Sequence, residues 1–358
     1  MGSSITLIKM SKMKSPTEKF LILCVIMLSA ILVIACVKYY LLIQKAKCDS
    51  QHNNVHLSMN DMAPYERVSN NSRLIYDLLP NAVATETGYW AAIKPTSVEI
   101  NADGFRDKNY SIETPAAVFR IAAIGDSLTF GFGVESDESY PKVLEKNLNS
   151  KNKQTFEVLN LGISGYNTGQ EVEFLTDRGL KYHPDLVIVG YFPNDIENTS
   201  EFEMLEKKFF SEYANNESLI KAQNYSLKEL YVFSSLKAIS SIRSELSKTN
   251  FSDAFRSVNE SLKKLSLLSL NNSFKVMIVF IPGNPGIKHV YQSEQKEAIK
   301  HICEENNWCF LNLEPIYDSH NLWNEVLDPQ DPHPNPYAYS IISEEIYKKL
   351  AECRIISE

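Results

Sequence analysis

The sequence contains little cysteine, with 6 among 358 residues and no C-x-x-C pair. Zinc ribbons and dithiol redox motifs need such pairs, so neither kind of site is indicated. Three of the cysteines, Cys303, Cys309 and Cys353, lie in the large part of the chain beyond the N-terminal region. Three thiols allow at most one disulfide among them.

The chain also lacks a basic excess, since 36 Lys and Arg residues face 44 Asp and Glu residues. Seven of the lysines precede Cys48, where Glu18 is the single acid, so the rest of the chain is more acidic than the formal charge of −8 suggests. Nucleic-acid binding depends on basic groups that neutralise phosphates, so we expect no nucleic-acid partner. Internal repeats and low-complexity tracts are missing too, and the 44% of apolar residues suits a packed globular core.

What the chain does have is a long apolar run. Phe20–Val37 contains 18 residues without a charge, and apolar residues continue after Lys38 to Ile43. A helix of this length, at about 1.5 Å per residue, spans a hydrocarbon core of roughly 30 Å. The apolar region of a cleaved signal peptide is shorter, at about 7–15 residues. Four lysines precede the run, which predicts a membrane anchor at 20–43, a basic cytoplasmic tail at 1–19 and a body outside the cytoplasm.

A lipid anchor is the alternative to this transmembrane helix. Val33-Ile34-Ala35-Cys36 resembles the lipobox of bacterial lipoproteins, and a start at Met13 would place Cys36 at an ordinary distance from the N-terminus. The apolar stretch YYLLI that follows is unlike the polar linker of most lipoproteins. Both versions tether the body to a membrane on the periplasmic or extracellular side.

The rest of the chain divides into a polar tether at 44–64, a lead-in segment at 65–117 and a larger domain at 118–350. Within the domain, strands are expected at 118–124, 156–161, 186–191, 275–281 and 308–313, and helices at 140–148, 169–181, 293–306 and 339–350. This alternation predicts an α/β fold with a parallel, doubly wound sheet. Residues 197–254 exceed the length that a crossover needs, so we expect a helical insert there, with ordinary extra helices on the sheet as the alternative.

Polar residues follow the first expected strand. Gly125-Asp126-Ser127-Leu128-Thr129 comes directly after it, and sites in open parallel sheets lie outside the carboxyl ends of the strands. Thr129 replaces the second glycine of the G-x-S-x-G nucleophile elbow, so this segment is not that motif. On these residues alone, Ser127 as a helix N-cap is the better interpretation. Asp126 is expected to hydrogen-bond the turn.

Three further polar segments follow later strands. They are Asn160–Gly165, Pro193-Asn194-Asp195 and Asp331–Asn335. A serine nucleophile needs a base, which His333 can supply, and the base needs an acceptor such as Asp331. The backbone N–H groups of Ser127 and Gly165, with the side-chain amide of Asn194, can donate to an oxyanion.

Taken together, GDSL, NLGISG, a strand-terminal ND and DPHPN resemble the SGNH/GDSL hydrolases over about residues 118–350. The resemblance implies a flavodoxin-like three-layer α/β/α sandwich that uses no cofactor, and we expect no metal. It implies Ser127 as nucleophile, His333 as general base and Asp331 as the residue that orients the base. It also implies Ser127, Gly165 and Asn194 as oxyanion donors. Upstream, NADGFRD at 101–107 resembles a segment found before the GDSL block in many membrane-linked members.

The sequence departs from the family pattern at two places. Asp331 lies two residues before His333, where many members have a spacing of three. The shorter spacing is similar to that of polysaccharide acetyl-transfer proteins in the family. Phe192 begins the third block, which often begins with glycine, so the size of the pocket stays open.

The sequence therefore predicts a membrane-tethered serine ester hydrolase that acts outside the cytoplasm on an ester-bearing small molecule, lipid or glycan. An O-acetyltransferase of surface polysaccharide would use the same triad and differ in how its pocket excludes water and binds the acceptor. A non-catalytic scaffold with the same fold is the third possibility. Intact Ser127, Asn194, Asp331 and His333 weigh against it, although motifs alone do not establish geometry.

Overall fold

The computed structural model describes residues 65–74, 76–86, 94–115, 117–196, 247–283, 289–328 and 331–356. The predicted cytoplasmic tail, membrane anchor, lipobox and tether lie outside these ranges, as do residues 197–246 of the predicted insert. Within the described ranges, no helix combines the length and the apolar character needed to cross a bilayer.

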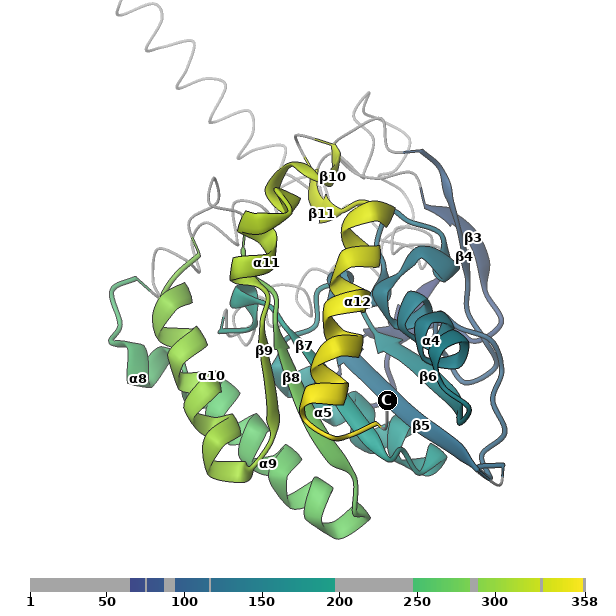
Figure 1. Cartoon of the computed structure of the whole chain (residues 1–358), viewed down its shortest axis with the longest axis horizontal. Helices are drawn as coiled ribbons and strands as arrows, with labels where there is room; N and C mark the ends of the chain where they lie inside the picture. The colour runs from purple at the N-terminus through teal and green to yellow at the C-terminus, as the bar shows by residue number, and fades with distance from the viewer. Residues whose placement is uncertain are drawn as a thin grey trace, which may run out of the picture. The chain divides into compact units, whose positions relative to one another are not determined.

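The described residues include a five-stranded parallel sheet (Figure 1). Its strands are β5 (Val118–Gly125), β6 (Thr155–Gly162), β7 (Leu186–Tyr191), β8 (Lys275–Phe280) and β9 (Cys309–Asn312). The spatial order is β6-β5-β7-β8-β9. The strand that comes first in the sequence, β5, therefore lies second in the sheet, as in flavodoxin-like sheets. The predicted parallel α/β sheet is confirmed, and each strand boundary lies within one residue of the prediction.

Helices cover both faces of the sheet, because successive residues of a strand point to opposite sides. In β5, Ala122 and Ile124 pack into one core, while Ile121 and Ala123 pack into the other. The first core is covered by α5 (Thr168–Phe174), α9 (Arg256–Asn272) and α10 (Gln292–Asn306), and the second by α4 (Tyr140–Lys151), α11 (Glu314–Ser319) and α12 (Pro336–Glu352). The three-layer α/β/α arrangement agrees with the prediction.

Helix α12 shows why these residues form a helix that faces the sheet. Its apolar residues Ala338, Ile342, Ile346 and Leu350 recur at every fourth position and are buried. The side chain of Asn335 accepts the N–H of Ala338 at 3.0 Å and so caps the N-terminus. A proline follows the cap at the first helical position, where it is well tolerated. The helix therefore begins three residues before the predicted start.

The lead-in segment forms two short antiparallel hairpins. The first pairs β1 (Glu66–Val68) with β2 (Tyr76–Leu78), and the second pairs β3 (Val83–Glu86) with β4 (Thr96–Glu99). Strands of three or four residues are too short to show a clear alternation, which is why the sequence did not predict them. Tyr65, Leu78 and Phe105 from this segment are buried in the same core as Ile124. The lead-in is thus packed onto the sheet domain.

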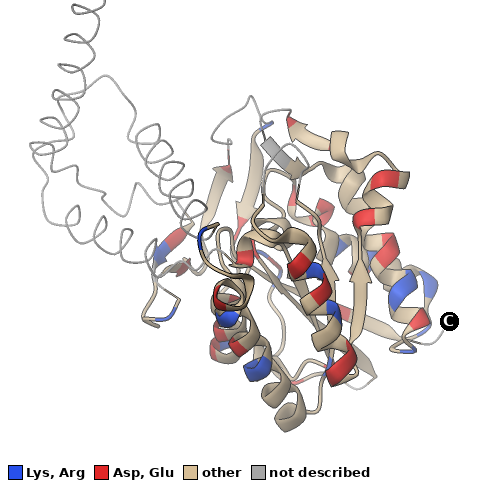
Figure 2. Cartoon of the chain, turned by 90° about the vertical axis from the view of Figure 1, so that its left-hand side faces the viewer, with Lys and Arg blue, Asp and Glu red and all other residues tan. Residues whose placement is uncertain are grey.

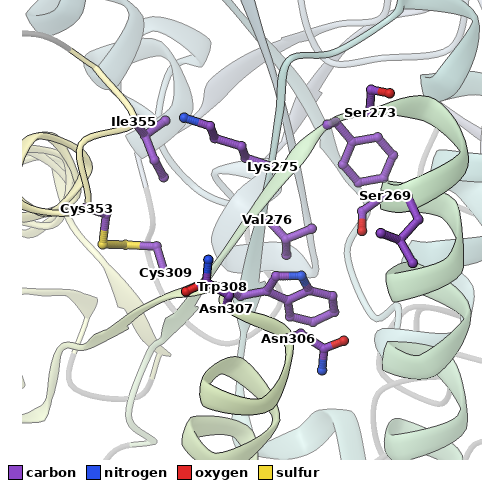
Figure 3. Close-up of a pocket in the computed structure, with 12 residues that line it drawn as sticks. Ser269, Ser273, Lys275, Val276, Asn306, Asn307, Trp308, Cys309, Cys353 and Ile355 are labelled. Atoms are coloured by element: carbon purple, nitrogen blue, oxygen red, sulfur yellow. A yellow bond between two sulfur atoms is a disulfide. The ribbon is translucent and has the colours of Figure 1, made fainter.

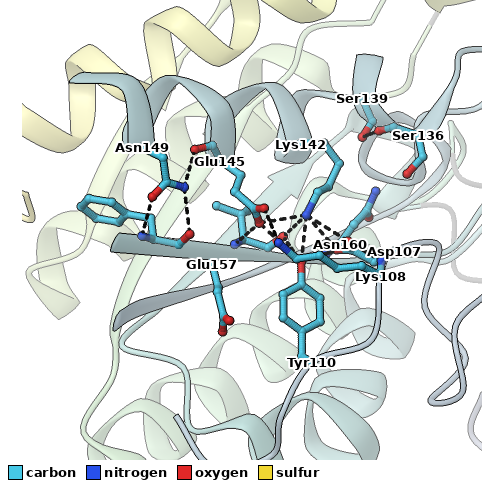
Figure 4. A network of polar contacts seen from close by, with 12 residues as sticks. Asp107, Lys108, Tyr110, Ser136, Ser139, Lys142, Glu145, Asn149, Glu157 and Asn160 are labelled. Carbon is cyan, nitrogen blue, oxygen red and sulfur yellow. Dashed lines mark hydrogen bonds and ion pairs between the residues drawn. The ribbon is translucent and has the colours of Figure 1, made fainter. Parts of the chain in front are cut away.

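A buried polar network joins the lead-in to α4 and β6 (Figure 4). The ammonium group of Lys142 lies 2.9 Å from a carboxylate oxygen of Asp107 and 2.9 Å from one of Glu145. The carboxylate of Asp107 also accepts the N–H of Asn160 at 2.9 Å. Burial raises the pKa of Asp107, and the nearby Lys142 cation and the Asn160 N–H act against that rise. The contacts with Lys142 and with the Asn160 N–H thus offset the free-energy cost of burying the Asp107 carboxyl group.

A single disulfide joins Cys309, at the start of β9, to Cys353, just after α12. The two Cα atoms are 6.1 Å apart, and the bond connects residues separated by 44 positions. Cys303 is a buried free thiol. The bridge fits the limit of one disulfide that the three cysteines set, and it ties the last helix to a strand of the sheet.

Three glycines lie in register at the carboxyl ends of neighbouring strands. Gly125 of β5 pairs with Gly162 of β6 and with Gly190 of β7. A Cβ atom at Gly162 would lie 2.3 Å from the backbone nitrogen of Phe130, closer than atoms can approach. The missing side chains let the short helix α3 (Ser127–Phe130) lie directly against the sheet.

We expect Gly162→Ala to lower the free energy of unfolding by about 1–3 kcal/mol, because the added methyl group meets backbone that must move. Gly169→Ala is the matched control, since a Cβ atom there would contact only side-chain atoms of Asn167 and Ser261. The nearer atom, Asn167 Oδ1 at 3.1 Å, caps the helix and must shift by a few tenths of an ångström. Alanine favours the helix over glycine, so the control should lose less stability than Gly162→Ala. Urea unfolding of both variants measures the difference in their free energies of unfolding. Equal stability of the two would show that α3 does not need a glycine at position 162.

We expect loss of the disulfide through Cys309→Ser with Cys353→Ser to cost about 2–4 kcal/mol, because the unfolded chain regains the freedom of the closed loop. Urea unfolding with and without reductant provides the measurement. Reductant should destabilise the unmodified protein and leave the double variant unchanged. Insensitivity of the unmodified protein to reductant would show that the bridge contributes nothing.

Candidate active site

Ser127 is the first residue of α3, and the residue before it caps that helix. A carboxylate oxygen of Asp126 accepts the N–H of Leu128 at 2.9 Å. The expected structural role of Asp126 in the turn is therefore confirmed. The interpretation of Ser127 as the N-cap is wrong, because a carboxylate one residue earlier already fills that position.

The hydroxyl of Ser127 contacts the imidazole of His333. Ser127 Oγ and His333 Nε2 are 2.8 Å apart, although 206 positions separate the two residues in the sequence. His333 lies in β11 (Asp331–Pro334), which pairs with β10 (Val326–Asp328) just before α12. The sequence placed this histidine after the last strand of the sheet but did not predict the hairpin. The predicted nucleophile and base thus lie within hydrogen-bond distance.

The third predicted member of the triad is only partly described. The backbone of Asp331 begins β11, two residues before His333. The side chain of Asp331 lies outside the described part of the structure. Its role in orienting the imidazole therefore stays a prediction.

The two further oxyanion candidates lie at the ends of the strands on either side of β5. Gly165 follows β6 in a tight turn that begins at Ile163, whose N–H donates to the carbonyl of Gly125 at 3.0 Å. Asn194 follows β7, and its amide nitrogen lies 3.4 Å from a carboxylate oxygen of Asp126. Both bonds fix these segments to the residues immediately before Ser127. The structure therefore brings the predicted donors to the same end of the sheet as Ser127, the predicted nucleophile.

The buried carboxyl group of Asp126 links the turn that carries Ser127 to Asn194. It is 1% exposed, and this burial raises its pKa. The N–H of Leu128, the nearby His333 and the amide of Asn194 favour the ionised form and oppose the rise. Burial thus favours the neutral form of this carboxyl group, while the residues around it favour the ionised form.

The sequence did not identify Arg106 as part of the site, although it lies in the NADGFRD segment. Its guanidinium is fully buried and donates to the backbone carbonyls of Phe130 at 3.2 Å, Gly131, and Val134 at 2.6 Å. These carbonyls belong to the last residue of α3 and to the loop after it. The ring of Phe132 in this loop packs 4.8 Å from the imidazole ring of His333. An arginine has five N–H donors and stays charged, so it can hold several carbonyls at once. The presence of Arg106 in the NADGFRD segment was the signal that could have identified it from the sequence.

A second unexpected feature is Glu171, in the helix that follows the Gly165 turn. It is 1% exposed, and neither carboxyl oxygen has a hydrogen-bond partner among the described residues. Burial, followed by the charges of Asp195 and Asp126, raises its pKa well above the usual range. Burial therefore favours the neutral form of the Glu171 carboxyl group.

One pocket of about 700 Å³ lies away from these residues (Figure 3). Its lining includes Lys275 and Cys309, the first residues of β8 and β9, together with Trp308 and the disulfide. Ser127 and its neighbours follow the opposite, carboxyl ends of the strands. The pocket is thus separate from the candidate active site. In the described part of the chain, no group of three His, Cys, Asp or Glu side chains is suited to hold a metal ion.

We expect Glu171→Gln to change how stability depends on pH. A carboxyl group with a raised pKa binds more protons in the folded protein than in the unfolded one, so it destabilises the fold progressively as pH rises above its usual pKa near 4.5. The free energy of unfolding of the Gln variant relative to the unmodified protein should therefore increase from pH 5 to pH 8, by up to about 1.4 kcal/mol per pH unit.

Glu173→Gln on the same helix is the control for this measurement. Burial opposes ionisation of Glu173, but hydrogen bonds from Asn71 and Lys264 outweigh it and lower the pKa to about 2. The stability from this group is present above its usual pKa and is lost only as pH falls toward 2. The effect of Glu173→Gln should therefore stay constant from pH 5 to pH 8. A flat profile for Glu171→Gln as well would show that Glu171 is ionised in the folded protein.

Comparison with known proteins identifies the family. Residues 123–341 match the GDSL-like Lipase/Acylhydrolase family, and no curated protein sequence matches the chain. Similar solved structures include TesA, which is 12% identical with a TM-score of 0.44 over 65% of this chain and 99% of that one. The psychrotrophic esterase EstA from Pseudoalteromonas sp. is 16% identical with a TM-score of 0.41 over 66% of this chain and 99% of that one. The acetylxylan esterase Axe2 from Geobacillus stearothermophilus is 14% identical with a TM-score of 0.41 over 65% of this chain and 94% of that one. Because the family match covers more than half of its residues, the chain belongs to the GDSL-like lipase/acylhydrolase family and is an ester-hydrolysing enzyme.

Proposed function

We propose that the chain is a membrane-tethered serine esterase in which Ser127 is the nucleophile and His333 the general base. The observation that supports this assignment best is the 2.8 Å contact between Ser127 Oγ and His333 Nε2. A serine hydroxyl is a weak nucleophile unless an adjacent base accepts its proton. The ring of Phe132 against the imidazole limits the orientations that the base can adopt.

In the proposed reaction, Ser127 Oγ attacks the carbonyl carbon of the ester while His333 Nε2 takes the hydroxyl proton. The resulting oxyanion accepts hydrogen bonds from the N–H groups of Ser127 and Gly165 and from the amide of Asn194. Collapse of this intermediate releases the alcohol, which takes the proton from His333, and leaves the acyl group on Ser127. Water then attacks the acyl group, gives its proton to the imidazole, and frees the acid as the proton returns to Ser127.

We assign the orienting role to Asp331 on the basis of its spacing from the base. A carboxylate that accepts the other ring N–H of the base fixes the tautomer and stabilises the imidazolium. Asp331 is separated from His333 by one proline, and both belong to β11. No cofactor enters the proposed reaction, and every proton transfer uses Ser127, His333 or the reacting molecules.

The proposed substrates are esters of small molecules, lipids or glycans outside the cytoplasm. The apolar run at 20–43 supports a membrane tether, with a lipid anchor at Cys36 as the alternative. The Cys309–Cys353 bridge supports an oxidising compartment, because disulfides rarely persist in the cytosol. Figure 2 shows acidic and basic positions interleaved along the described helices, which supports a partner other than nucleic acid.

Transfer of the acyl group to a sugar hydroxyl is the second candidate function. The D-x-H spacing of Asp331 and His333 favours it, since this spacing is similar to that of acetyl-transfer proteins of polysaccharides. The chemistry up to the acyl-enzyme is the same, and only the molecule that attacks the acyl group differs. An oligosaccharide acceptor should raise turnover if transfer is the main reaction, and should leave it unchanged if hydrolysis is.

We expect the full-length protein in detergent to hydrolyse p-nitrophenyl acetate and to react with a fluorophosphonate probe. Ser127→Ala should abolish labelling, and Ser127→Ala and His333→Ala should each lower kcat/KM by about 10³-fold or more. His320→Ala, which changes an exposed histidine after α11, should keep the activity. Labelling that persists in Ser127→Ala would refute the assignment of the nucleophile.

A further inference from the structure

The turn that carries Gly165 has a defined geometry. The N–H of Tyr166 donates to the carbonyl of Ile163 at 3.2 Å, which closes a four-residue turn with Ser164 and Gly165 in its centre. Gly165, the third residue, has φ = +80°, a value that is typical of a type II turn and that glycine adopts without strain. In a type I turn the central peptide is rotated by about half a turn relative to type II. The direction of the Gly165 N–H therefore depends on which turn type the chain keeps.

The hydroxyl of Tyr76, in the lead-in strand β2, reaches this central peptide. It donates to the carbonyl oxygen of Ser164 at 2.6 Å, a contact between residues 88 positions apart. The carbonyl of Ser164 and the N–H of Gly165 belong to one planar peptide unit and point in opposite directions. A bond that fixes the carbonyl therefore fixes the N–H as well. Rotation of the peptide toward a type I turn would break this bond.

Tyr76 is itself held by several contacts. The hydroxyl of Tyr166 donates to the Tyr76 backbone carbonyl, and the two rings meet edge to face with centroids 5.3 Å apart. The backbone of Tyr76 pairs with Val68 in the first hairpin. At Gly165, a Cβ atom would lie 2.7 Å from the Tyr76 hydroxyl oxygen. Glycine thus serves two needs, since it permits the positive φ and leaves room for the tyrosine.

The hydrogen bond also affects the strength of the peptide as a donor. A carbonyl that accepts a hydrogen bond polarises its peptide unit, and the N–H of that unit becomes a stronger donor. Donors that are fixed before the reaction stabilise a developing oxyanion without the cost of reorganisation. The stronger N–H donor and its fixed direction both stabilise the negative charge that develops on the ester oxygen in the transition state. They stabilise the uncharged carbonyl of the ground state much less.

We propose that Tyr76 is a positioning residue of the oxyanion site, which holds the Ser164–Gly165 peptide so that its N–H faces the reacting carbonyl oxygen. The inference rests on the proposed function, in which the Gly165 N–H is an oxyanion donor. It assigns a part in ester hydrolysis to the lead-in segment, which precedes the residues 123–341 that match the family. Tyr76 touches neither substrate nor nucleophile in this role and acts through the peptide.

The test is Tyr76→Phe in the full-length protein, which removes the hydroxyl and keeps the ring. Loss of one complete oxyanion donor typically lowers kcat by about 10²–10³-fold. Since the N–H stays present but loses its fixed direction, we expect a fall in kcat of about 10-fold or more, with KM changed less than about twofold. Titration with the fluorophosphonate probe gives the concentration of active sites, so partial misfolding does not distort kcat.

Tyr65→Phe is the matched control, because its hydroxyl also lies in the lead-in but donates to the carboxylate of Glu86. This control should keep kcat within twofold even where its thermal stability falls. A trifluoromethyl ketone, which forms a tetrahedral adduct with an oxyanion, should lose affinity for Tyr76→Phe by the same factor as kcat/KM falls. A merely structural role would not produce that correspondence.

Each remaining outcome overturns one of the two proposals. If Tyr76→Phe keeps kcat within twofold while Ser127→Ala is inactive, the role of Tyr76 is wrong and the proposed function stands. The role is also wrong if Tyr65→Phe and Tyr76→Phe lower kcat equally, since general loosening of the lead-in then explains both. If Ser127→Ala retains the activity of the unmodified protein, the proposed function itself fails.

Discussion

The site depends on the absence of three side chains at one place in the sheet. Gly162, Gly125 and Gly190 stand side by side on adjacent parallel strands, and the first turn after β5 lies against them. Any side chain at Gly162 would push on the backbone of Phe130. The position of α3 fixes Ser127 at its start and the loop with Phe132 at its end. The positions of Ser127 and of the Phe132 ring beside His333 therefore both depend on the close approach of α3 to the sheet.

The sheet alone does not hold the loops that extend beyond it, and the lead-in segment supplies the missing contacts. Arg106 donates to carbonyls at the end of α3 and in the loop after it, and Tyr76 donates to the carbonyl of Ser164 in the turn after β6. In both cases a long side chain reaches a backbone acceptor that regular secondary structure leaves unused. Asp107 and Lys142 attach the same segment to the helix α4. The lead-in thus holds the loops around the candidate site through their carbonyl groups.

Much of this architecture was predictable because it depends on patterns within short stretches of chain. The run LVIVGY predicted β7 at 186–191 without error, and the order of the polar segments predicted that Ser127 and His333 would meet. The hairpins of the lead-in were missed because such short strands carry no periodic signal. Tyr76 and Glu171 were missed for a different reason, since a hydrogen bond across 88 positions and the burial of a charged residue both arise from tertiary packing. The orienting role of Asp331 still rests on its spacing.

The separation of Ser127 and His333 by 206 positions also has a consequence for how the protein becomes active. Contact between residues so far apart closes a long loop, and the packing of the folded chain must offset the entropy that this costs. A chain in which β5 and α3 have formed without β11 and α12 would carry Ser127 without its proposed base. A serine hydroxyl without an adjacent base is a weak nucleophile, so under the proposed assignment reactivity toward esters requires that both ends of the sheet domain have folded.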